Sequence, residues 1–199
     1  MQSALAQCAS HVARVCAVTV GQAERLLLLS GWNVDHLLSE FFRKSHAALW
    51  AAAGLPPCEP APASGFTPNQ FMATPAARAC ENCAEEEHLF SLWCGHTYCG
   101  DCWSGWIRAK FTELGPLHRL KCMGLKCTAA LTSDSLHALR APEVARLPEL
   151  WLHSYVWTKP TLKRCPAAAC GLLVSHSAPW TTGAPKATDK VPFDASQYL

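Results

Sequence analysis

The chain of 199 residues is 50% hydrophobic and only 16% charged, with a formal net charge of +2, a balance that favours folded domains and excludes a disordered chain. Its length suits two or three small modules. No apolar run approaches the roughly 18 residues of a membrane span, and the opening residues lack a secretory signal, so we expect an intracellular protein, cytoplasmic or nuclear, with no membrane partner.

The first part of the chain, residues 1–54, predicts a helical module. Thr19 and Gln22 stand at capping-box spacing before the run ERLLLLSGW, and Asn33 to Asp35 can cap a second helix through HLLSEFF. Leucine and phenylalanine at these spacings more often form a core than a binding surface. Residues 55–75 are rich in proline, alanine, serine and glycine, and we interpret them as a linker.

A dense group of cysteines follows the linker. Its pattern is C-x2-C-x10-C-x-H-x2-C-x2-C-x19-C-x4-C, formed by Cys80, Cys83, Cys94, His96, Cys99, Cys102, Cys122 and Cys127. Zinc prefers four tetrahedral ligands from thiolate and imidazole, so eight ligands predict two complete zinc sites. The alternative, a disulfide framework, is typical of small secreted chains and would leave the histidine without a role.

The order of three cysteines, one histidine and four cysteines, with CGHTYCGDCW at its centre, resembles a RING finger, here over residues 76–131. RING fingers are cross-braced. The resemblance implies one zinc held by Cys80, Cys83, Cys99 and Cys102 and another held by Cys94, His96, Cys122 and Cys127. The expected fold class is therefore a set of small α+β zinc-dependent modules, with an N-terminal helical bundle, a cross-brace RING finger and connecting helices. In so small a domain, metal binding and folding are one event.

Apolar residues after Cys102 recur at the spacing of one face of a short helix; they are Trp103, Trp106, Ile107 and Phe111. The resemblance implies that an E2 ubiquitin-conjugating enzyme docks here, and the predicted contacts are Asn82, Trp93, Trp103 and Trp106. Alternatively these residues only fill the core, which is at least as well supported for Trp103. Trp93 and Trp106 are the better surface candidates. Asn82 replaces the usual aliphatic residue of the family, which predicts altered E2 binding.

The rest of the chain restricts the resemblance from RING fingers in general to one class of RING proteins. Residues 132–162 predict connecting helices, interrupted by Pro142 and Pro148. Residues 163–199 open with KRCPAAACG and continue as an irregular tail; Cys165 and Cys170 resemble the first ligands of an in-between-RING module and form at best a further partial zinc site. This pair and the four-residue spacing in CMGLKC are similar to the Ariadne-like RING-between-RING ubiquitin ligases.

That resemblance implies an E3 ubiquitin-protein ligase, a transferase whose first RING recruits a ubiquitin-charged E2 and modifies an unknown protein substrate. It also implies that residues 1–54 are similar to a ubiquitin-associated-like (UBA-like) domain, which can bind ubiquitin or a ubiquitin-like protein. In the family, ubiquitin passes through a cysteine of a second RING. No cysteine follows Cys170, so we expect a fragment or truncated isoform without autonomous transfer activity.

Two other functions stay open from the residues alone. One is a stand-alone RING ligase or adaptor that needs no cysteine intermediate; the other is a zinc-stabilised nucleic-acid or scaffold module. A basic stretch would support nucleic-acid binding; it comprises Arg108, Lys110, Arg119, Lys121 and Lys126. Two such zinc sites would, however, lower the net charge to about −1. Nucleic acid is therefore not the expected partner.

Overall fold

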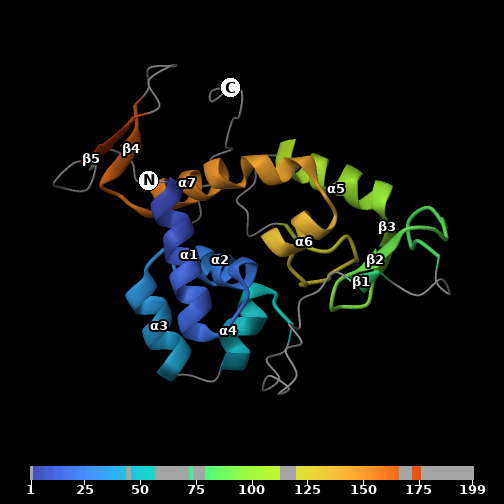
Figure 1. The fold of residues 1–199 in the computed structure, drawn as a ribbon, viewed down its shortest axis with the longest axis horizontal. Helices are drawn as coiled ribbons and strands as arrows, with labels where there is room; N and C mark the ends of the chain where they lie inside the picture. Colours follow the sequence, from blue (N-terminus) through green and yellow to red (C-terminus); the bar gives the residue numbers. More distant parts are fainter. Residues whose placement is uncertain are drawn as a thin grey trace.

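The computed structural model describes residues 2–43, 46–56, 72–73, 79–112, 120–165 and 172–175. Four helices open the chain and pack as a bundle at one end of the molecule (Figure 1): α1 (Gln2–Cys16), α2 (Val20–Leu29), α3 (Val34–Arg43) and α4 (His46–Ala53). The core of this bundle is apolar and includes Leu5, Val12, Leu26, Leu27, Leu37, Phe41 and Trp50. The helices predicted for this part of the chain are therefore present.

The helix starts follow the predicted caps. The Thr19 hydroxyl accepts the backbone N–H of Gln22 at 3.2 Å, and the Gln22 side chain accepts the backbone N–H of Thr19 at 2.9 Å, which completes a capping box. Asn33 Oδ1 accepts the backbone N–H of His36 at the start of α3. Local sequence therefore determines where α2 and α3 begin.

The last helix of the bundle ends at Gly54, whose φ of +68° is in the left-handed region. The N–H groups of Gly54 and Leu55 donate to the carbonyls of Ala51 and Trp50, both at 3.0 Å, the two bonds of a Schellman motif. Leu55 is buried beside Trp50 in the bundle core, although it begins the segment predicted as a linker. The bundle thus extends slightly beyond its last helix.

A small antiparallel sheet follows, with strands in the order β1 (Met72–Ala73), β2 (Leu89–Ser91) and β3 (Thr97–Cys99). Leu89 lies opposite Cys99, and Ser91 lies opposite Thr97. The two residues of β1 come from the predicted linker and pair with Phe90 and Ser91 of β2. β3 leads directly into α5 (Gly100–Thr112), so strand and helix are joined at Cys99 and Gly100.

A second core lies between this sheet and α5. Trp103 and Ile107 have no exposed surface, and the Trp103 indole N–H donates to the carbonyl of Phe90 at 3.2 Å. The Tyr98 ring meets Trp103 edge-on, with 5.5 Å between ring centroids. α5 is therefore fixed to both β2 and β3 by one tryptophan.

The connecting region consists of α6 (Ser133–Ala138), the 3₁₀ helix η2 (Pro142–Arg146), α7 (Leu147–Thr158) and a hairpin of β4 (Leu162–Arg164) and β5 (Leu173–Ser175). The connecting segment is divided into separate helices near Pro142 and Pro148, as the sequence predicts. Both stand in the first turn of a helix, where no backbone N–H is needed and the fixed φ of proline fits. Among the described helices, none combines the length and apolarity needed to cross a membrane.

The helical bundle and the second core are in direct contact. Figure 1 shows α7 running from the bundle towards α5, and its Trp151, like Leu28 of α2, packs against both cores. The Trp32 indole N–H donates to Ser154 Oγ of α7 at 3.3 Å. The Thr19 hydroxyl also donates to Asp134 Oδ2 of α6 at 2.6 Å. The fold is thus mixed helix and small sheet, with its parts interlocked.

Candidate metal centre

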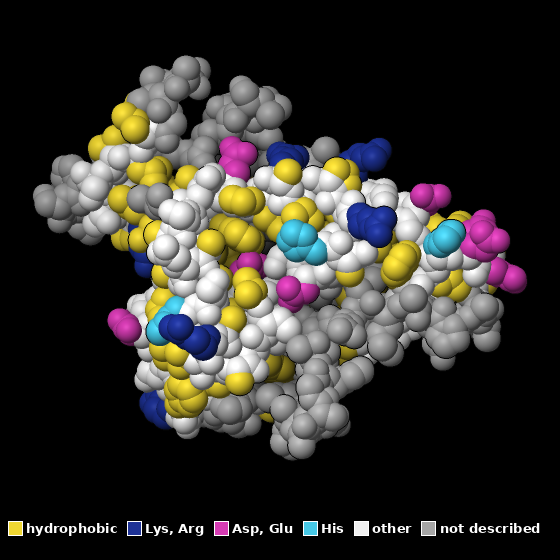
Figure 2. Space-filling view, viewed as in Figure 1, with side chains coloured by type: hydrophobic (Ala, Val, Ile, Leu, Met, Phe, Trp, Pro, Cys, Tyr) yellow, Lys and Arg dark blue, Asp and Glu magenta, His cyan; other side chains and the backbone are white. Residues whose placement is uncertain are grey.

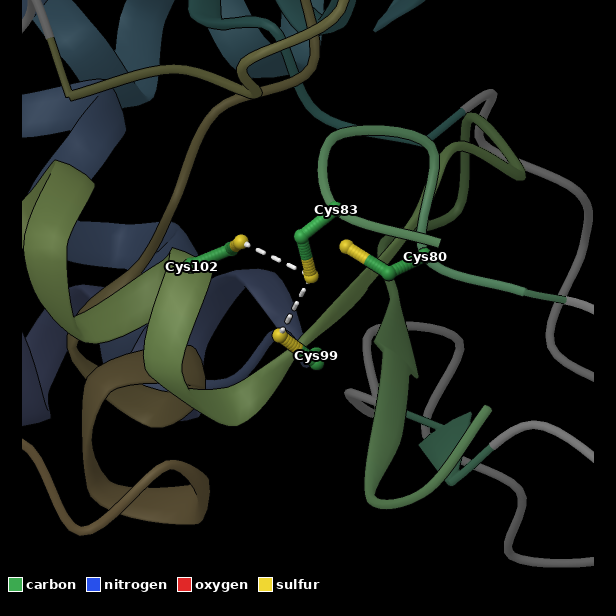
Figure 3. A group of neighbouring side chains, drawn as sticks. All are labelled: Cys80, Cys83, Cys99 and Cys102. Atoms are coloured by element: carbon green, nitrogen blue, oxygen red, sulfur yellow. Dashed lines mark hydrogen bonds between the residues drawn. The ribbon is translucent and has the colours of Figure 1, made fainter. Parts of the chain in front are cut away.

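Four cysteines meet beside the start of α5 and form what we call the all-cysteine cluster (Figure 3). Cys80 and Cys83 lie in a turn before β2, Cys99 ends β3, and Cys102 lies in the first turn of α5. Figure 3 shows their side chains directed at one another, with 3.6 Å from Cys83 Sγ to both Cys99 Sγ and Cys102 Sγ. Zinc with bonds of about 2.3 Å to sulfur requires roughly 3.8 Å between neighbouring sulfurs of a tetrahedron. The four sulfurs therefore fit a zinc ion.

A second group, the histidine-containing cluster, consists of three cysteines and a histidine. Cys94 and His96 come from the loop between β2 and β3, and Cys122 and Cys127 come from the segment that follows α5. His96 Nδ1 lies 3.4 Å from Cys94 Sγ, and all four ligand atoms lie within 4.8 Å of one another. A tetrahedral zinc ion requires roughly 3.5 Å between a nitrogen and a sulfur ligand, so this group also fits zinc.

The two groups interleave along the chain, because the second takes its first two members from between the halves of the first. This is the pairing that the RING resemblance implies. Each group is closed by four ligands, either four thiolates or three thiolates and an imidazole. Such sets are typical of structural zinc sites rather than of catalytic sites with an open position. The chain therefore contains two zinc-binding clusters.

Hydrogen bonds to sulfur favour the thiolate form that zinc binds. Asn82 Nδ2 donates to Cys102 Sγ at 3.2 Å, and the backbone N–H of Gly124 donates to Cys122 Sγ at 3.4 Å. The hydrogen bond between Cys94 and Cys122 lowers the pKa of Cys94 to about 5 and raises the pKa of Cys122, so the negative charge of this pair lies on Cys94. Each cluster thus has polar neighbours suited to negative charge.

The predicted E2 contacts differ in exposure. Asn82 is exposed, Trp93 is 40% exposed, and Trp106 is partly exposed, with its indole N–H donating to the carbonyl of Lys121 at 2.9 Å. Trp103 is 0% exposed, so its predicted contact with E2 is corrected: the residue belongs to the core between β2, β3 and α5. The sequence analysis gave Trp103 a core role as its alternative and preferred Trp106 for the surface, and the exposures agree with that preference.

Of the last two predicted ligands, only Cys165 lies within the described residues. Cys165 is partly buried next to the β4–β5 hairpin, and its backbone N–H donates to the carbonyl of Leu172 at 2.9 Å. Cys170 lies outside the described residues, so the predicted partial site of Cys165 and Cys170 stays a prediction.

Sequence reasoning did not single out Leu125, which is 90% exposed between Cys122 and Cys127. The exposure of Leu125 could have been predicted from the sequence CMGLKC of residues 122–127. A large apolar residue in a tight turn, between two ligands of the same metal, has little freedom to reach a core. Leu125 therefore joins the exposed residues around the clusters.

Comparison with known proteins identifies relatives, although no family model matches the chain. The chain is 30% identical over 167 residues to Probable E3 ubiquitin-protein ligase ARI3 of Arabidopsis thaliana, covering 81% of this chain and 29% of that protein. It is 30% identical over 161 residues to Putative E3 ubiquitin-protein ligase ARI4 of the same plant, covering 78% and 28%. Probable E3 ubiquitin-protein ligase rbrA of Dictyostelium discoideum is 31% identical over 96 residues, covering 46% and 18%.

The chain spans less than a third of the length of these relatives, while the matches to the two plant proteins cover more than three quarters of the chain. Those matches are long enough to take in residues well beyond the two zinc-binding clusters. The interleaved clusters and the similarity together support the Ariadne-like RING-between-RING family for this chain.

Proposed function

We propose that this chain is the E2-recruiting part of an E3 ubiquitin-protein ligase of the RING-between-RING class. The observation that carries the proposal is the pair of interleaved clusters in a chain similar to E3 ligases over 81% of its length. In this proposal all eight clustered residues are zinc ligands. Zinc would act structurally, by holding the loops around α5 in one arrangement.

The proposed E2 surface consists of Asn82, Trp106 and Leu125, with Trp93 at its edge. Asn82 and Trp106 are linked through Cys102: Asn82 donates to its sulfur, and Trp106 follows it by one helical turn on α5. Trp106 in turn donates to Lys121, which leads into the loop that carries Leu125. The surface thus draws on segments from both clusters, so it depends on both zinc ions.

The helical bundle has its own proposed role, as a UBA-like domain that binds ubiquitin or a ubiquitin-like protein. Its exposed apolar residues support such a role, in particular Phe42 at the end of α3, which is 65% exposed. An unidentified protein substrate completes the proposed set of partners.

Nucleic acid is the less favoured partner. On the face shown in Figure 2, lysine and arginine side chains lie at scattered points and form no continuous patch. A nucleic-acid surface usually concentrates its positive charge.

The decisive experiment counts zinc by native mass spectrometry and then titrates the zinc-loaded chain with a ubiquitin-charged E2. We expect two zinc ions and saturable binding, weakened about ten-fold in Trp106→Ala, because a large aromatic side chain at the centre of an interface often contributes this much. Trp157→Ala removes another exposed aromatic residue, from α7 and outside both proposed surfaces, and serves as the control. No E2 binding by the unchanged, zinc-loaded chain would contradict the proposal.

A second measurement tests the expectation that this chain does not itself carry ubiquitin. Among its described cysteines outside the clusters, Cys16 is buried, and burial raises its pKa to about 11, which suppresses the nucleophilic thiolate. After incubation with charged E2, we expect no ubiquitin adduct that a reducing agent releases. Such an adduct would show transfer through one of the chain's own thiols.

A further inference from the structure

The carbonyl oxygen of Gly54 accepts hydrogen bonds from two segments that also carry ligands of the histidine-containing cluster. It accepts the indole N–H of Trp93 at 3.3 Å and the backbone N–H of Ala130 at 2.7 Å. Trp93 directly precedes Cys94, and Ala130 follows Cys127 by three residues. One oxygen atom of the helical bundle therefore joins the two segments that supply the ligands of this cluster.

Gly54 also packs tightly against the backbone of the segment that follows Cys127. A Cβ atom at this position would lie 2.2 Å from the carbonyl oxygen of Thr128, the residue after Cys127, and 3.2 Å from the backbone nitrogen of Ala130. Both are backbone atoms, so a side chain at Gly54 cannot be accommodated by a rotamer change. The bundle approaches this ligand segment as closely as two backbones can.

The segment after Cys127 is held from its other side as well. Cys122 donates its backbone N–H to Ala129 at 2.8 Å, and Leu131 donates to Leu120 at 3.0 Å. The segment of Ala129 to Leu131 is thus hydrogen-bonded to Gly54 on one side and to the segment that carries Cys122 on the other. The Schellman motif that ends α4 fixes the direction of the Gly54 carbonyl.

We propose that Gly54 is a positioning residue for the zinc site of the histidine-containing cluster, acting through Trp93 and Ala130, so that the helical bundle sets how firmly this cluster retains zinc. A metal site binds more tightly when its ligands are held in place before the metal enters. Through its two hydrogen bonds, the Gly54 carbonyl fixes the separation between the segment that carries Cys94 and the segment that carries Cys127. The inference concerns zinc alone and does not depend on E2 binding.

The sharpest test removes only the indole hydrogen bond. Trp93→Phe keeps an aromatic ring but has no N–H to donate to Gly54. Trp32→Phe is the matched control, because its indole N–H also makes a 3.3 Å hydrogen bond between the bundle and another element, here Ser154 of α7. Zinc release from the full zinc-loaded chain is followed with a colour-forming chelator, which reports the rate and amount for each variant.

We expect one of the two zinc ions to leave about five-fold faster in Trp93→Phe, as the loss of one hydrogen bond implies, with release from Trp32→Phe unchanged. Cobalt substitution identifies the site, because cobalt centres with four thiolates differ in their visible spectra from those with three thiolates and an imidazole. The bands of the histidine-containing cluster are expected to fade first. Equal release from the two variants, or faster loss from the all-cysteine cluster, would overturn the proposal.

Gly54→Ala extends the test to the backbone contact, with Gly31→Ala as its control. Both glycines have left-handed φ values, +68° and +61°, but a Cβ on Gly31 would meet only ordinary contacts at 3.6 Å from Thr158. Gly54→Ala is expected to lose zinc from the histidine-containing cluster faster than Gly31→Ala. If Gly54→Ala does not fold, the comparison of Trp93→Phe with Trp32→Phe decides the question.

Discussion

Glu24 is an acidic side chain held inside the molecule. It lies on α2, only 4% exposed, close to Ser133 and Asp134 at the start of α6. Burial raises the pKa of Glu24 from its ordinary 4.5 to about 8; the hydrogen bond with Ser133 opposes this shift, and the charge of Asp134 adds to it. At neutral pH the folded chain therefore holds a proton that the unfolded chain releases.

This residue predicts a pH dependence of stability. Between about pH 4.5 and 8 the native state binds more protons than the unfolded state, so the free energy of unfolding falls as pH rises, by up to about 1.4 kcal/mol per pH unit. Urea unfolding of the zinc-loaded chain at pH 6.5 and 8.0 measures the fall. Glu24→Gln should remove much of it, whereas Asp35→Asn, on the bundle's α3, should leave it unchanged. An equal slope in both variants would contradict the assignment.

At the scale of elements, Thr19 connects a helix start to a distant helix. Its hydroxyl caps α2 through Gln22 and donates to Asp134 of α6, 115 residues further along the chain. Gly21 allows the approach, because a Cβ there would lie 2.5 Å from Asp134 Oδ2. The Thr19 hydroxyl that caps α2 therefore also holds the start of α2 against α6.

Replacement of Thr19 should therefore cost more than the loss of an ordinary cap. Thr19→Ala removes the cap and leaves the Asp134 carboxylate without this donor, and we expect a loss of about 1–3 kcal/mol in the free energy of unfolding. Thr19→Ser retains the hydroxyl and should retain most of the stability. Asn33→Ala, which removes only an exposed cap, should cost less; thermal unfolding of the three variants gives the order.

The same elements show how far sequence reasoning extends. Thr19 and Gln22 were predictable because a capping box is local, and the eight clustered residues were predictable because ligand spacing in a tight turn reflects the reach of the side chains. The core position of Trp103 was favoured but not decided, since helical period alone does not say which neighbour α5 meets. The hydrogen bonds of Gly54 and Thr19 with residues far along the chain were invisible, because no local pattern encodes them.

For the whole molecule, the two cores share Leu28 and Trp151, so the zinc clusters and the helical bundle support one another. Removal of zinc should unfold the region around α5 first, because Trp103 of α5 packs on β2 and β3, and β3 ends at Cys99. The bundle should lose part of its stability at the same time, through α7 and α6.

Hydrogen exchange with and without a zinc chelator tests this coupling. We expect amides of α5 to lose protection completely and amides of α2 to exchange faster by a smaller factor, with recovery when zinc is restored. Cys99→Ala should reproduce the effect of the chelator, while Cys8→Ala should not, because Cys8 belongs to neither cluster. Unchanged exchange in α5 after chelation would show that zinc does not hold this region.

The proline-rich stretch of residues 55–75 looks like a natural place to divide the chain. Residues at both of its ends, however, make contacts with the zinc-binding region. A fragment beginning at residue 76 would keep all eight clustered residues but leave behind β1, the partner strand of β2, and the Gly54 carbonyl to which Trp93 and Ala130 donate. The RING region of this protein therefore loses part of its own packing when it is separated from the helical bundle. A chimera that grafts it onto another scaffold must bring α4 and its Schellman turn along.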